Sequence, residues 1–172
     1  KAKEGKEFSK DKLYNLLHEV GKWYHRILQG EKGADARHYL EERGIDFTTA
    51  RKFGLGYAPD SWDALLKWGK QHGYSPELLE TAGMVKRSDK AAGKQTHWYD
   101  RFRARLMFPV FDEIGRVIGF SGRLLKEEEK AAKYSLLKNL EIVLESSDPQ
   151  KQHLMFKING NPNVTVFRKG DN

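Results

Sequence analysis

Three arginines alternate with other residues between Asp100 and Pro109: Arg101, Arg103 and Arg105. In an extended chain successive side chains point to opposite faces, so this spacing predicts all three guanidinium groups on one face. Like charges crowded on one face repel, and a polyanion is the partner that would offset their repulsion. A solvated strand edge whose charges discourage aggregation explains the same pattern, and composition alone leaves both interpretations open.

Two further arginines, Arg116 and Arg123, lie on or just after the next apolar run and are candidates for the same basic surface. Arg105 begins the first run and Arg123 follows the second. If the runs form an antiparallel hairpin, these two arginines reach the same end of it, where one phosphate would bridge them. In the alternative interpretation, one of them pairs with Asp100 or Asp112 and fastens the hairpin.

Aromatic rings and one imidazole interleave with this charge: His97, Trp98, Tyr99 and Phe102. Proteins that bind single-stranded nucleic acid use this mixture, stacking bases beside a groove that follows the phosphates. Rings near strands more often fill a core, and we favour that role for Trp98 and Tyr99. The other three tryptophans lie on helical stripes and are predicted packing residues: Trp23, Trp62 and Trp68.

Metal and acid–base chemistry has little support in the sequence. The 6 histidines are scattered, and the chain has no cysteine, so neither disulfides nor thiolate zinc ligands are available. Neighbouring carboxylates in Glu127–Glu129 point in different directions, which disfavours a pair of magnesium ligands. We predict no metal site in this chain, and a tight turn at Gly54–Pro59.

Composition places the chain among soluble proteins with an anionic partner. Its 172 residues are 32% charged, and the net charge of +7 favours a polyanion, because binding releases counterions. No apolar run reaches the roughly 20 residues of a membrane span, and the N-terminus lacks a signal-peptide core, so we expect a cytoplasmic protein. Without an initiating Met, we expect Lys1 to be internal to a longer chain.

The elements that must position these residues begin with helices. Apolar residues recur at helical spacing from Leu13 to Leu28, between a start signal at Ser9 and a stop at Gly30. Shorter helices are predicted over four further ranges: 35–43, 48–53, 61–73 and 75–83.

Strands follow. Apolar runs at 106–111 and 116–120 predict a β-hairpin, and 154–158 with 164–167 predict a second one. The polar stretch 86–95 is predicted to be a loop, and 136–144 fits a strand or a helix. The fold class is therefore α+β, with a helical N-terminal half packed on a small antiparallel sheet.

Several motifs together resemble the N-terminal subdomain of the catalytic core of bacterial-type DNA primases. They occur in this order: Tyr39–Ile45, Phe53–Pro59, Ala82–Gly83, Asp100–Val110, Gly115–Arg123 and Lys133–Tyr134. The resemblance covers roughly residues 11 to 134. So many motifs in one order make coincidence improbable.

The resemblance implies a core that makes RNA primers on single-stranded DNA template from nucleoside triphosphates, with Mg²⁺ or Mn²⁺. It also implies a zinc domain before this region, a metal-binding toprim fold after it and a domain that binds the replicative helicase. A basic ridge would guide the template, and its implied residues are Arg101, Arg103, Arg105, Arg123 and Lys133.

Two departures limit the resemblance. After Lys133 and Tyr134 the chain continues Ser135-Leu136-Leu137, unlike the family's usual motif, and it lacks the acidic toprim signature. We therefore assign 1–134 to the primase subdomain, leave 135–172 as an unassigned extension, and expect no activity from this chain alone. A stand-alone nucleic-acid-binding module and a protein-interaction module are the alternatives.

Overall fold

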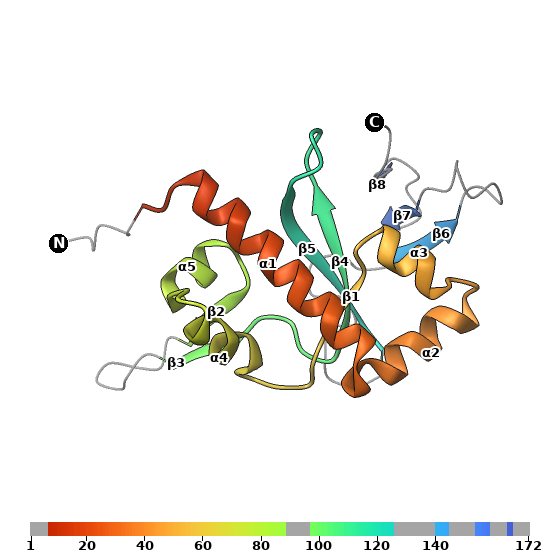
Figure 1. Ribbon diagram of the computed structural model, residues 1–172, viewed down its shortest axis with the longest axis horizontal. Coiled ribbons are helices and arrows are strands. Elements are labelled where there is room, and N and C mark those ends of the chain that lie inside the picture. Colours follow the sequence, from red (N-terminus) through yellow and green to blue (C-terminus); the bar gives the residue numbers. More distant parts are fainter. Residues whose placement is uncertain (1–6, 89–96, 126–139, 145–153, 159–164, 167–172) are drawn as a thin grey trace.

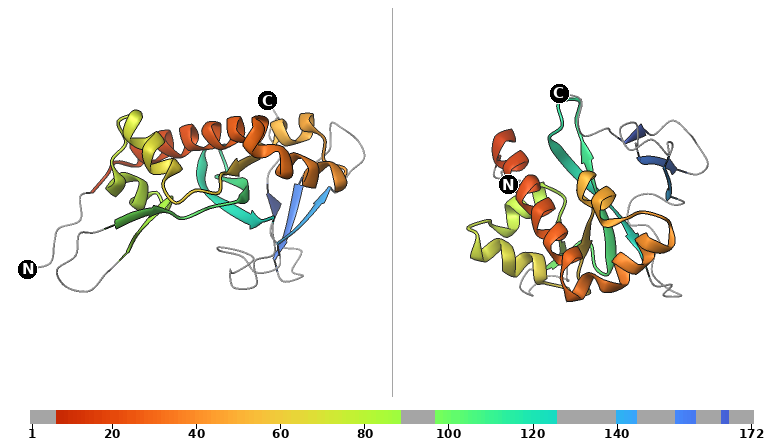
Figure 2. Two further views of the ribbon diagram at one scale, coloured as in Figure 1. Left: turned by 90° about the horizontal axis from the view of Figure 1, so that it is seen from below. Right: turned by 45° about the vertical axis from the view of Figure 1, so that its right-hand side comes forward.

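The computed structural model describes residues 7–88, 97–125, 140–144, 154–158 and 165–166. Helices occupy the first half and pack beside a small antiparallel sheet, so the predicted α+β class is confirmed (Figure 1). Helix α1 runs along the molecule, with α4, α5 and the β2–β3 pair toward one end and α2 and α3 toward the other (Figure 2).

Helix α1 spans Lys10–Gln29 and begins and ends where the sequence predicts. The Ser9 side chain accepts a hydrogen bond from the Lys12 N–H, and the Gly30 N–H closes the last turn on Arg26 and Ile27. One stripe of this helix is buried: Leu16, Leu17, Val20, Tyr24 and Leu28. The stripe covers both β1 and β5, which makes α1 the main support of the sheet.

Short helices complete the N-terminal half. A 3-10 turn at Glu31–Gly33 leads into α2 (Ala34–Glu42), and α3 (Phe47–Lys52) follows. Asp46 begins α3 by accepting the Thr49 N–H at 2.7 Å.

Helices α4 (Ala64–Gln71) and α5 (Pro76–Thr81) follow, and Ser75 caps α5. Helix α4 begins three residues later than predicted, which places Trp62 outside the helix.

The central sheet joins β1 (Gly56–Ala58), β4 (Arg105–Phe111) and β5 (Val117–Leu124), all antiparallel in the order β1-β4-β5. The β4–β5 hairpin was predicted. Strand β1 was not, because Gly54–Pro59 was interpreted as a tight turn. Only Gly54 has a turn conformation, with φ +67, and Gly56 lies so close to α1 that a Cβ there would come within 2.5 Å of the Tyr24 Cβ.

Alternating side chains divide this sheet between two apolar clusters. Met107 and Phe120 pack with the α1 stripe and with α4 and α5. Leu106 and Phe108 point the other way and pack with residues of α2 and α3. Both faces are covered, so each sheet residue can be assigned to one face from its place in the register.

The remaining strands form two small antiparallel sheets. Strand β2 (Val85–Ser88) pairs with β3 (His97–Asp100), so the predicted loop 86–95 begins as a strand, and its residues 89–95 lie outside the described part. The segment 136–144, which fitted either a strand or a helix by sequence, contains strand β6 (Leu140–Leu144). Strands β7 (Leu154–Ile158) and β8 (Thr165–Val166) form the predicted second hairpin.

Candidate nucleic-acid interface

The backbone around Arg101, Arg103 and Arg105 is not an extended strand. Strand β3 ends at Asp100, strand β4 begins at Arg105, and Ala104 between them has φ +48. The Ala104 N–H donates to the Pro59 carbonyl at 3.3 Å, which fixes this reversal. The prediction that all three guanidinium groups share a face is therefore wrong, because a left-handed residue breaks the two-residue period.

Arg103 lies against aromatic rings at the surface. Its Cζ is 3.7 Å from the centre of the Trp62 ring and 5.9 Å from that of Tyr99, and its guanidinium also donates to the Asp100 carbonyl. Trp62 is 63% exposed, so the prediction that it is a packing residue is wrong. We call Trp62, Tyr99 and Arg103 the Arg103 cluster.

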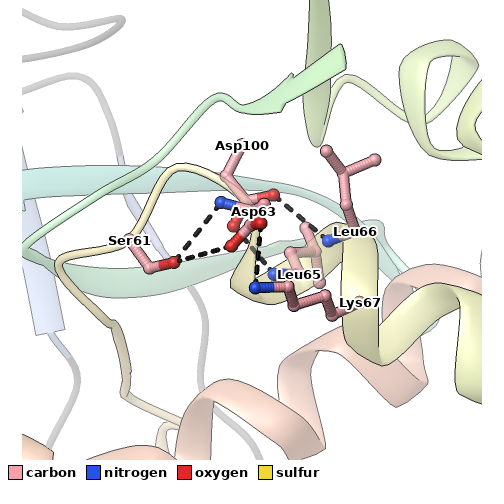
Figure 3. A network of polar contacts seen from close by, with 6 residues as sticks. All are labelled: Ser61, Asp63, Leu65, Leu66, Lys67 and Asp100. Carbon is pink, nitrogen blue, oxygen red and sulfur yellow. Dashed lines mark hydrogen bonds and ion pairs between the residues drawn. The ribbon is translucent and has the colours of Figure 1, made fainter. Parts of the chain in front are cut away.

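A buried carboxylate, Asp100, lies next to Tyr99 in the chain and bonds the start of α4 (Figure 3). Asp100 Oδ2 accepts the Leu65 N–H at 2.7 Å and Oδ1 accepts the Leu66 N–H at 3.2 Å, which satisfies two N–H groups at the start of α4. The Asp100 N–H donates to the Trp62 carbonyl at 2.8 Å. Asp100 thus ties β3 to the segment that presents Trp62.

The charge of Asp100 is costly in this position. Burial raises its pKa to about 6, although the N–H groups of Leu65 and Leu66 favour the ionised form. Asp63 lies in the same network, where it bonds Ser61 and Lys67 (Figure 3). Its negative charge adds to the rise in the pKa of Asp100.

Arg101 and Arg105 are turned toward the protein. Arg101 Nη1 donates to the Gly83 carbonyl at 3.4 Å, beside the turn that ends α5. Arg105 is 8% exposed, and its Nη1 donates to the Gly122 carbonyl at 3.4 Å. Burial lowers the pKa of Arg105, and a Cβ at Gly122 would lie 3.1 Å from the Arg105 Cδ.

Arg123 shares an end of the hairpin with Arg105 but not a face. Arg105 is in register with Leu124, and Leu106 with Arg123. The predicted common end is therefore confirmed. Paired residues share a face and neighbours along a strand do not, so the two arginines point to opposite faces, and the bridging phosphate is wrong for this geometry.

Arg123 instead lies near Tyr39 of α2. Its Cζ is 5.2 Å from the centre of the Tyr39 ring, and the Cζ of Arg43 is 4.6 Å from the same centre. We call Tyr39, Arg43 and Arg123 the Tyr39 cluster. Sequence reasoning did not select Arg43, although its spacing of four from Tyr39 on a predicted helix indicates that the two side chains meet.

The remaining two predicted residues, Arg116 and Lys133, also lie outside the two clusters or outside the described residues. Arg116 lies in the turn at the far end of the hairpin, where its Nε is 2.7 Å from Asp112 Oδ2 and its Cζ is 4.1 Å from the centre of the Tyr14 ring. Asp112 does fasten the hairpin, but through Arg116 and not through Arg105 or Arg123 as considered above. Lys133 lies outside the described residues.

The resemblance implies Mg²⁺ or Mn²⁺ in the catalytic core. In the part of the chain that the structure describes, no group of three or more His, Asp or Glu side chains is placed to hold such an ion. Among the described helices, none is both long and apolar enough to cross a membrane.

The chain is thus a small α+β domain that carries two arginine–aromatic clusters. The model of the family "DNA primase catalytic core, N-terminal domain" matches residues 23–143. The chain belongs to this family, and the resemblance is confirmed. The family match continues past residue 134, and the division at that residue stays a prediction.

Relatives of known sequence agree with the family. The chain is 43% identical over 119 residues to the DNA primase of Clostridium acetobutylicum, a match that covers 69% of this chain and 19% of that protein. It is 40% identical over 116 residues to the DNA primase of Escherichia coli K12, covering 66% and 19%. The chain thus corresponds to about a fifth of these primases.

Solved structures agree as well. The DnaG primase catalytic domain bound to single-stranded DNA is 39% identical, with a TM-score of 0.63 over 72% of this chain and 38% of that one. The RNA polymerase domain of Mycobacterium tuberculosis primase DnaG, in complex with double-stranded DNA, is 36% identical, with a TM-score of 0.66 over 73% and 38%. The chain has the fold of part of a primase catalytic core.

Proposed function

We propose that this chain provides part of the surface on which a DNA primase holds its single-stranded template. The observation that carries the proposal is the Arg103 guanidinium stacked 3.7 Å from the centre of the exposed Trp62 ring. Similar primase structures in complex with single-stranded and double-stranded DNA support it.

The Arg103 cluster combines the two interactions that single strands need. Arg103 covers one side of the Trp62 indole, and the 63% exposure of Trp62 leaves ring surface on which a base can stack. Such stacking contributes about 1–3 kcal/mol per base and tolerates any sequence. The guanidinium beside it supplies a positive charge for a phosphate.

The Tyr39 cluster offers a second place where phosphates of the same DNA strand can bind. Arg43 and Arg123 bring two positive charges to one tyrosine ring. The path along the backbone from Arg103 to Arg123 runs two residues to Arg105, crosses the β4–β5 ladder to Leu124 and returns one residue to Arg123. Their Cα atoms are therefore within about 16 Å, a span that a few nucleotides cover.

The other residues predicted for the basic surface would not contact the template directly at either cluster. Arg101 and Arg105 would add positive potential from beneath the surface, since Arg105 is almost fully buried. Arg116 and Lys133 remain predictions, the first at the far end of the hairpin and the second outside the described residues.

The chemistry of the whole primase belongs to the longer protein. We propose that it transfers nucleotidyl groups from nucleoside triphosphates, with Mg²⁺ or Mn²⁺ held by residues outside the described part. Zn²⁺ in a separate domain, contact with the replicative helicase and location at the nucleoid are part of the same proposal. This chain would hold and direct the template.

Titration of labelled oligo-dT at several salt concentrations tests the proposal. Arg103→Ala should reduce the slope of log K against log salt by about 0.7, the value for one phosphate of a single strand. Trp62→Ala should weaken binding by about 1–3 kcal/mol and leave the slope unchanged, because it removes stacking and no charge. Arg26→Ala, an exposed arginine of α1 outside both clusters, is the matched control.

Two results would contradict the proposal. One is that Arg103→Ala and Trp62→Ala both keep the oligo-dT affinity and the salt slope of the wild type. The other is an equal loss in Arg26→Ala, which would mean that net charge alone, and not the Arg103 cluster, determines binding.

A further inference from the structure

A cavity of about 200 Å³ shares no residue with the Arg103 cluster or the Tyr39 cluster. It lies where α1, the end of α3 and the β4–β5 hairpin meet (Figure 1). Apolar side chains form its floor: Pro109, Phe111 and Val117. Basic side chains form its rim: His18, Lys22 and Arg51. An apolar floor below a basic rim suits a ligand that has a ring and a negative charge.

The rim has a clear preference for anions. No Asp or Glu is among the described residues that line the cavity. Arg51 is exposed in the last turn of α3. Lys22 Nζ lies 2.9 Å from Glu19 Oε1, but an exposed pair of this kind contributes little and can be exchanged for a phosphate.

One wall is fixed by internal hydrogen bonds. The Leu55 carbonyl only accepts, so His25 Nδ1 donates to it at 2.6 Å, and the Gln29 amide donates to His25 Nε2 at 3.0 Å. Both ring nitrogens are thus used inside the protein, and the ring serves as a flat wall. Since an apolar cavity of about 150 Å³ can bind benzene, about 200 Å³ is room for one ring system.

We propose that this cavity binds a mononucleotide, with the base on Phe111 and Val117 and the phosphate on Arg51 and Lys22. A phosphate monoester carries nearly two negative charges at neutral pH, which matches two cations. The planar guanidinium of Arg51 can bind two phosphate oxygens at once. The site is independent of the proposed template surface, because it uses other residues on another part of the fold.

Amide chemical shifts of the 172-residue chain titrated with AMP test the site, with adenosine and inorganic phosphate as separate probes. Millimolar AMP should shift Arg51, Phe111 and Val117 and saturate, whereas adenosine or phosphate alone should bind much more weakly. Arg51→Ala should weaken AMP binding about tenfold by removing charge-assisted hydrogen bonds. Phe111→Ala should weaken AMP and adenosine but not phosphate.

The control is Arg87→Ala, an exposed arginine of β2 that does not line the cavity, and it should bind AMP like the wild type. Absence of saturable shifts around the cavity, or unchanged AMP affinity in Arg51→Ala, would overturn the proposal. Shifts confined to the Arg103 and Tyr39 clusters would also overturn it. Arg51→Ala should leave oligo-dT affinity unchanged, so the two proposals can fail separately.

Discussion

Replacing Asp100 with asparagine isolates the cost of the buried charge beneath the Arg103 cluster. Asp100 is 3% exposed and accepts the N–H groups of Leu65 and Leu66. Asparagine has nearly the same shape, but only its amide oxygen accepts, so one of the two N–H groups would face an NH2 group and lose its acceptor. We therefore expect Asp100→Asn to be less stable than the wild type near pH 4, by about 1–3 kcal/mol.

The difference between the two proteins should change as the pH rises. The folded pKa of about 6 lies above the ordinary value of 3.8, so the folded state holds its proton longer than the unfolded state does. Ionisation then costs the wild type stability from about pH 4 to about pH 6, in total about 3 kcal/mol, and the asparagine variant has no such loss. The stability deficit of Asp100→Asn should therefore shrink by about 3 kcal/mol between pH 4 and pH 6.

Urea unfolding followed by circular dichroism at intervals from pH 4 to pH 7 measures this difference. The carboxylates with lowered pKa values, Glu19, Asp46, Asp63 and Asp112, titrate in both proteins and largely cancel in the comparison. Asp100→Leu is the calibration, because it leaves two N–H groups without an acceptor and should be destabilised by about 1–3 kcal/mol for each. A difference in the free energy of unfolding that stays constant from pH 4 to pH 7 would refute the reasoning, since the ionisation of Asp100 would then cost the folded state nothing.

Four further outcomes are expected. The chain alone should make no oligoribonucleotide on single-stranded DNA with ribonucleotides and Mg²⁺ or Mn²⁺, and reproducible template-dependent product in a primer-synthesis assay would disprove this. Its affinity for oligo-dT should fall with salt at a slope of roughly −2 to −3.5, as three to five phosphate contacts require, and a salt-independent affinity would count against them. Arg105→Ala should lower the melting temperature, while Arg123→Ala should keep it and reduce the salt slope by about 0.7; equal effects in the two variants would contradict their placement on opposite faces. Gly122→Ala should also lower the melting temperature, because its Cβ would lie 2.9 Å from the Phe102 ring, and an unchanged value would show that the ring can move.

The sequence predicted the parts of the fold that depend on neighbouring residues. The predicted helices begin beside capping side chains, since Ser9, Asp46 and Ser75 each accept an N–H group three residues on. The β4–β5 hairpin was also predictable, since two apolar runs flank a turn centred on Gly115. Local hydrogen bonds and local periodicity produce these elements, so short windows of sequence carry the information.

Elements that depend on distant residues were missed. Strand β1 has only three residues, and it is a strand because Met107, about fifty positions later, pairs with Gly56. Trp62 fits a helical stripe, but α4 begins after it because Asp100, rather than a residue near Trp62, satisfies the first N–H groups. No pattern of neighbouring residues predicts a partner that lies so far along the chain.

The same limit decides how far the basic surface could be predicted. The alternation of Arg101, Arg103 and Arg105 brings three positive charges into one short segment, but each guanidinium takes its role from what it lies against. Arg103 lies on Trp62 and stays accessible, whereas Arg105 lies on Gly122 and is buried. Exposure of the aromatic partner distinguishes these two: Trp62 is exposed beside Arg103, which we propose meets the nucleic acid, whereas Arg105 supports the fold. We include Arg43 in the proposed surface because it shares the Tyr39 ring with Arg123.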